Sequence, residues 1–135
     1  MENRVGMRWT SLLHNPEGVN AAYQGNPPDL RGVRVHEVTL QVEGPTLKLR
    51  LDLPEYPDRP PRKWAVQKFN TVQIEISFSG LRSVSLGGFK SEISADVSIT
   101  EGDGVNVRVT APGVHLQANA ATVFISTLTA YVDEA

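Results

Sequence analysis

The sequence predicts a mainly β protein, built as an antiparallel sheet or a sandwich-like meander with a short N-terminal helical segment. Apolar and polar residues alternate over many short runs, which is the period of a half-buried strand. Turn residues such as Gly-Asp-Gly separate these runs. No long helical run supplies the crossovers that a parallel sheet needs. We therefore predict one domain over residues 1–135, with a helical part at 1–31 and an antiparallel β part at 32–135.

The helical period is confined to the N-terminal part. Trp9, Leu12 and Leu13 have the spacing i, i+3, i+4, which places them on one face of a short helix. Pro16 should interrupt this helix, because proline has no backbone N–H and disfavours a helical residue before it. A second helical turn is predicted from Pro16 to Tyr23.

From Gly32 onward the period changes to two. The apolar phase slips between Val35 and Val38, which predicts a bulge near His36-Glu37. The pattern predicts strands at residues 33–42, 47–53 and 72–78, near Val84 and Leu86, at 93–99 and 105–109, and one or two strands over 116–120 and 123–131.

A proline-rich segment interrupts the strands between Pro54 and Lys63. Proline removes donors from a sheet and fixes φ, so this segment is predicted to be a loop, ordered by the packing of Tyr56 and Trp64.

The period of two also assigns each strand residue to a side of the sheet. The residues predicted to face the core are Leu47, Leu49, Leu51, Val72, Ile74, Ile76, Val97 and Val107. Those predicted to face the other side are Lys48, Arg50, Gln73 and Glu75.

Composition and charge exclude several classes of protein. Hydrophobic residues make up 40% and charged residues 21%, which suits a folded domain rather than a disordered chain. The net charge of −2 gives no broad positive field, so we expect no nucleic-acid partner. The sequence has no cysteine, which excludes disulfides, thiolate catalysis and cysteine-bound zinc.

Targeting signals are not predicted. Residues 1–8 mix charged and single apolar residues and lack the apolar run of a signal peptide. No stretch approaches the roughly 20 apolar residues of a membrane-spanning helix. We therefore expect no signal peptide and no membrane partner.

No pattern in the sequence indicates catalysis, a cofactor or a metal. His14, His36 and His115 lie in separate predicted elements without metal-ligand spacing. No serine lies in a G-x-S-x-G or S-x-x-K motif. Gly102-Asp103-Gly104 lies between two predicted strands, which is typical of a hairpin turn rather than a phosphate or calcium loop. We predict no catalytic residue, no cofactor and no metal.

Four residues near the proline-rich segment are candidates for binding a partner: Asp52, Glu55, Asp58 and Trp64. Trp64 follows two prolines and two cationic residues, and tryptophan and arginine are enriched in binding hot spots. A tryptophan after a proline turn more often anchors the loop to the core. Isolated loop carboxylates are more often solvated charges, so both interpretations stay open here.

A series of short segments carries a family resemblance. They are Trp9 with Leu12-Leu13, Tyr23, Asn26-Pro27-Pro28-Asp29-Leu30, Val35-His36-Glu37-Val38-Thr39-Leu40, Gly44-Pro45-Thr46-Leu47, Leu51-Asp52-Leu53-Pro54, Pro60-Pro61-Arg62-Lys63-Trp64 and Asn70-Thr71-Val72-Gln73-Ile74. In this order they resemble the immunity protein 50 family of bacterial polymorphic-toxin systems, from about Trp9 to Gly88.

The resemblance implies a bacterial cytoplasmic protein that binds and neutralises a cognate toxin, without catalysis and without a cofactor. It implies no particular contact residues. If the toxin is a nuclease with a basic substrate surface, Asp52, Glu55 and Asp58 are candidates to meet it, with Trp64 as an apolar anchor. The alternative is a β-rich module that binds a carbohydrate or another protein. An enzyme ranks third among the three hypotheses, because no nucleophile, metal set or cofactor fingerprint is visible.

Overall fold

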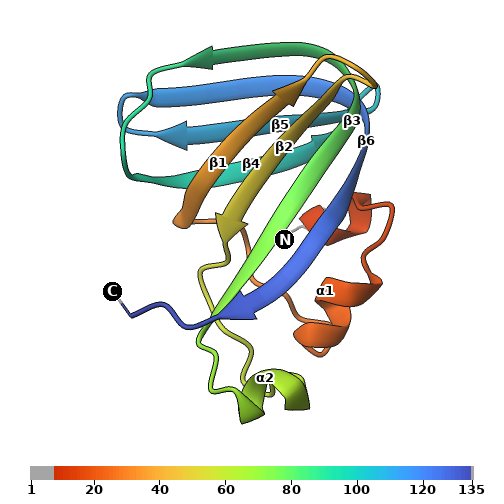
Figure 1. Ribbon diagram of the computed structural model, residues 1–135. Coiled ribbons are helices and arrows are strands. Elements are labelled where there is room, and N and C mark those ends of the chain that lie inside the picture. Colours follow the sequence, from red (N-terminus) through yellow and green to blue (C-terminus); the bar gives the residue numbers. More distant parts are fainter. Residues whose placement is uncertain (1–7, 135) are drawn as a thin grey trace, which may run out of the picture.

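A computed structural model describes residues 8–134 of the chain. Within these residues, six strands form one antiparallel sheet. The strands are β1 (Val33–Gln41), β2 (Thr46–Asp52), β3 (Thr71–Gly87), β4 (Ile93–Glu101), β5 (Val105–Ala111) and β6 (Val114–Tyr131). The sheet closes as a barrel in the order β1-β2-β3-β6-β5-β4, with β4 paired to β1 (Figure 1). The predicted mainly β, antiparallel fold is confirmed, and the structure adds the closure.

Two long strands, β3 and β6, connect the two halves of this barrel. They pair from Thr71 opposite Tyr131 to Gly87 opposite His115. β2 pairs with the first half of β3, and β5 pairs with the first half of β6. Residues 72–78 and the strand predicted near Val84 and Leu86 therefore belong to one strand. Gly80, at φ +68°, and a bulge between Leu81 and Ser83 let β3 bend there without ending.

The predicted bulge at His36-Glu37 is confirmed. The register between β1 and β2 shifts between Val35 and Glu37. After the shift, Val38 lies opposite Leu49, so an apolar residue again faces the inside of the barrel.

The barrel interior is filled by the alternating apolar residues. All eight residues predicted to face the core are buried, and Leu49, Ile74 and Ile76 are fully inaccessible to solvent. The four residues predicted on the other side, Lys48, Arg50, Gln73 and Glu75, are half-buried on the outer face.

The N-terminal part packs against the barrel as a 3-10 turn, η1 (Trp9–Leu12), and a short helix, α1 (Glu17–Ala22). Between them, Asn15 pairs with the backbone of β6. Its Nδ2 donates to the Ile125 carbonyl and its Oδ1 accepts from the Ile125 N–H, each at 2.8 Å. The predicted helical N-terminal part is confirmed, and it covers an edge of β6 that β5 leaves free.

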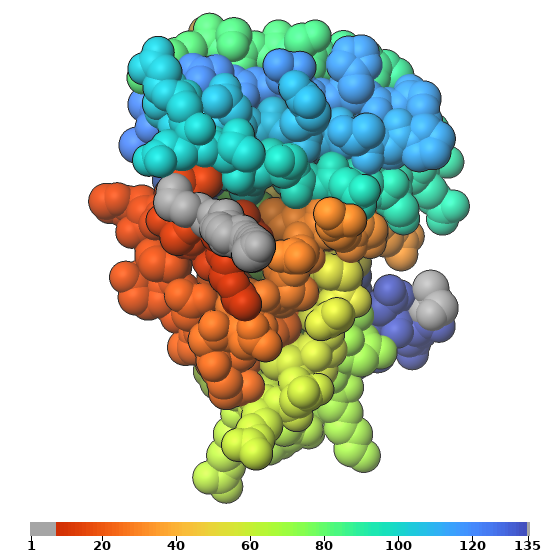
Figure 2. Space-filling view, turned by 180° about the vertical axis from the view of Figure 1, so that it is seen from behind, coloured from red at the N-terminus to blue at the C-terminus, as the bar shows by residue number. Residues whose placement is uncertain are grey.

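Residues 54–70 connect β2 to β3 and project from the barrel; we name them the tip (Figures 1 and 2). The tip contains a third helical element, α2 (Arg62–Val66). The prediction of a loop through Lys63 was therefore wrong at its end. The helix begins directly after Pro61, because the first turn of a helix has no use for the backbone donor that proline lacks.

Two predictions concern targeting. Residues 1–7, in which we predicted no signal peptide, lie outside the described residues. Across residues 8–134, no helix has both the length and the apolar character needed to cross a membrane.

Candidate functional site

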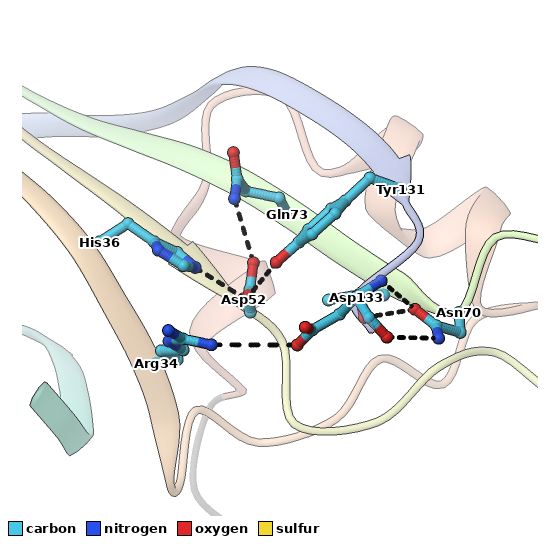
Figure 3. Close-up of polar contacts among 8 residues, drawn as sticks. Arg34, His36, Asp52, Asn70, Gln73, Tyr131 and Asp133 are labelled. Atoms are coloured by element: carbon cyan, nitrogen blue, oxygen red, sulfur yellow. Dashed lines mark hydrogen bonds and ion pairs between the residues drawn. The ribbon is translucent and has the colours of Figure 1, made fainter. Parts of the chain in front are cut away.

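A buried carboxylate lies on the outer face of the barrel, at the end of β2. Leu51 points into the barrel, so the alternation turns the next residue, Asp52, outward. Asp52 is nevertheless only 6% exposed. His36 of β1, Gln73 of β3 and Tyr131 of β6 surround it (Figure 3), and we name these four residues the Asp52 cluster.

The Asp52 carboxylate has a partner for each oxygen. The Tyr131 hydroxyl donates to Oδ2 at 2.7 Å, and His36 Nε2 lies 2.8 Å from the same oxygen. Gln73 Nε2 donates to Oδ1 at 3.1 Å. The buried charge is thus satisfied by groups from three neighbouring strands, which joins β1, β2, β3 and β6 on the outer face.

These contacts decide the ionisation of the cluster. Burial by itself would raise the pKa of Asp52. The hydrogen bonds from His36, Tyr131 and Gln73, with the charge of His36, outweigh burial and hold the pKa of Asp52 below its usual value. Burial and the hydrogen bond to Asp52 raise the pKa of Tyr131 to about 12. At neutral pH the site therefore contains a carboxylate and a neutral phenol.

Asp52→Asn should lower the free energy of unfolding by about 1–3 kcal/mol at neutral pH, because it removes a buried charged acceptor from half-buried donors. A carboxyl group with a lowered folded-state pKa stabilises the fold above its unfolded pKa of about 3.9. That stability is lost as the pH falls through the folded pKa. The difference in free energy of unfolding between the wild type and Asp52→Asn should therefore become smaller as the pH is lowered from 7 to below about 3.

Urea unfolding at several pH values measures this difference. Asp58→Asn is the matched control, because Asp58 is exposed on the tip. It should change stability by less than about 0.5 kcal/mol. A difference for Asp52→Asn that stays constant between pH 7 and pH 3 would show that the ionised carboxylate is not what stabilises the cluster.

The structure gathers three of the four predicted partner-binding residues in the tip. Glu55 and Asp58 are exposed on its loop, and Trp64 is half-buried on α2. The Trp64 ring packs against Tyr56, with ring centroids 6.4 Å apart. Asp52 lies at the base of the tip, with its carboxylate turned into the Asp52 cluster rather than toward solvent.

The tip is held by contacts at its base. The Tyr23 hydroxyl, at the end of α1, donates to the Glu55 carbonyl at 2.6 Å. Gln24 Nε2 donates to the Arg59 carbonyl at 2.7 Å. On the other arm, the Asn70 N–H donates to the Tyr131 carbonyl at 3.0 Å. Both arms are therefore anchored to elements that belong to the barrel or pack on it.

The sequence did not reveal the contacts within the Asp52 cluster. His36, Gln73 and Tyr131 were not predicted to contact Asp52, although the alternation places Gln73 on the outer face with Asp52. Within residues 8–134, no group of three or more histidine, aspartate or glutamate residues has the arrangement of a metal site.

The family model described as immunity protein 50 matches residues 15–131 of the chain. The chain belongs to the immunity protein 50 family. The match includes the Asp52 cluster and the tip, and it extends past Gly88 through β4, β5 and β6, where the sequence resemblance had ended. No curated protein and no solved structure matches the chain.

Proposed function

We propose that this member of the immunity protein 50 family is a non-catalytic protein of the bacterial cytoplasm that binds a cognate toxin and neutralises it. The observation that carries the proposal is the family match over residues 15–131, which spans α1 and all strands of the barrel. A closed barrel with anchored loops also suits a tight binder, because little conformational freedom is lost on association.

The tip is the proposed place of toxin contact. Glu55, Asp58 and Trp64 stand there on one projecting segment. Asp52 is the fourth candidate. Because it is only 6% exposed, its part in binding is to hold the base of the tip through the Asp52 cluster.

Co-expression with a toxin tests the proposal. The toxin encoded beside this gene is expressed in a susceptible bacterial host, with and without this protein. Only cells that also make this protein should survive, and calorimetry with a catalytically inactive toxin should show a complex at micromolar concentrations or below. A toxin from an unrelated system is the specificity control. Equal killing in both strains, together with no heat of binding, would refute the proposal.

A further inference from the structure

The tip is the cationic end of an acidic chain. The whole chain has a net charge of −2. Along residues 54–70 the charged side chains are the cations Arg59, Arg62, Lys63 and Lys68 and the anions Glu55 and Asp58, all of them on exposed residues. No ion pair between residues of the described range involves any of these cations. The positive charge of the tip is therefore not neutralised by an ion pair within residues 8–134.

One face of α2 combines this charge with an exposed apolar side chain. Arg62 and Val66 are separated by four residues, and Lys63 and Val66 by three, so all three lie on neighbouring positions of the helix surface. Val66 is 72% exposed, and no residue of α2 is buried. The helix thus presents an aliphatic side chain flanked by two cations and packs against the fold mainly through Trp64.

This face is held in position without a partner. Trp64 and Ala65 donate their N–H groups to the Pro61 carbonyl, and the Phe69 N–H returns to the Trp64 carbonyl at 3.2 Å. With the anchors at Glu55, Arg59 and Asn70, the helix is fixed relative to the barrel. A preorganised backbone loses little conformational freedom on binding, so less ordering free energy opposes the contacts made here.

We propose that α2 docks onto an acidic patch of the toxin, with Arg62 and Lys63 facing its carboxylates and Val66 entering an apolar spot between them. The proposal rests on the proposed function and names the chemistry of the partner. It reverses the charge sense expected from Asp52, Glu55 and Asp58 alone, because the cations of the tip outnumber its anions and Asp52 is buried. Opposite charges across the interface would speed association and select the partner.

A protein surface fits this face better than a nucleic acid. An aliphatic side chain such as Val66 gains nothing from a phosphate backbone, whereas an apolar centre with a charged rim is the usual anatomy of a protein interface.

The double charge reversal Arg62→Glu/Lys63→Glu tests the inference. It should weaken binding to the inactive toxin by about 30-fold or more, which is the loss typical of interface hot spots. Most of the loss should appear as slower association, and the wild type should lose more affinity than the variant when salt is raised. Both residues are exposed, so the midpoint of urea unfolding should not change.

The matched control is Arg31→Glu/Arg108→Glu, which makes the same charge change on exposed residues outside the tip. It should leave toxin affinity within about threefold of the wild type. Equal toxin binding by the wild type and the tip variant would overturn the inference and leave the proposed function standing. A tip variant that loses binding to an oligonucleotide probe but keeps toxin binding would overturn it too. If the wild type itself neither binds nor protects, the proposed function fails first.

Discussion

Leu49→Ala should lower the free energy of unfolding by about 2–5 kcal/mol, the range for truncating a fully buried leucine. Leu49 is inaccessible to solvent and lies between Val38 of β1 and Ile76 of β3. Alanine would remove apolar contacts and leave a cavity that a closed sheet relaxes around only in part. Urea unfolding with a constant slope for wild type and variant measures the loss.

Leu40→Ala is the matched control for this truncation. Leu40 lies opposite Leu47 and faces the same side of the sheet, but it is 50% exposed. Much of the apolar surface of Leu40 is already in contact with water, so its truncation should cost less than about 1.5 kcal/mol. Similar losses for the two variants would mean that burial inside the barrel does not set the cost.

The side of the sheet that each residue faces could be predicted from the sequence. In a strand the period of two is geometric, so Leu47, Leu49 and Leu51 must share a side whatever strands lie next to β2. The bulge at His36-Glu37 was predictable for the same reason, since only an extra residue restores the apolar phase at Val38.

The neighbours of each strand could not be predicted in this way. The pairing of β3 with β6 joins Thr71 to Tyr131, and the period of a strand carries no information about its partner. Closure through β1 and β4 is equally distant in sequence, with Val33 opposite Ala95. These long-range pairings turn the predicted strands into a barrel.

The same limit applies to the candidate site. Asp52 was recognised as a charged residue of interest, but its burial depends on the Tyr131 hydroxyl, which comes 79 residues later in the chain. The tip had a local signal, because Arg62 and Lys63 adjoin Trp64 in the sequence. The importance of Arg62 and Lys63 for the charge of the tip depends on the burial of Asp52 and the exposure of α2, which the sequence does not show.

Gly88→Ala should destabilise the barrel by about 2–5 kcal/mol. Gly88 has φ +75°, a left-handed conformation that costs an L-residue about 1–2 kcal/mol. An added Cβ would also collide with the carbonyl oxygen of Gly113, in the turn between β5 and β6. Because the colliding atom belongs to the backbone, no flexible side chain can move aside to relieve the contact. An overpacking cost of about 1–3 kcal/mol is therefore added.

Gly113→Ala separates the two costs, because Gly113 has the same φ of +75° but open space where its Cβ would stand. It should lose only the conformational part, about 1–2 kcal/mol. The collision at Gly88 would push the end of β3 away from β6, where Gly87 lies opposite His115 as their last pair. Hydrogen exchange at the Gly87 amide, opposite His115, should therefore accelerate more in Gly88→Ala than in Gly113→Ala. Equal losses of stability, with unchanged exchange at Gly87, would show that the turn moves freely away from β3. No close backbone contact would then hold this end of the barrel.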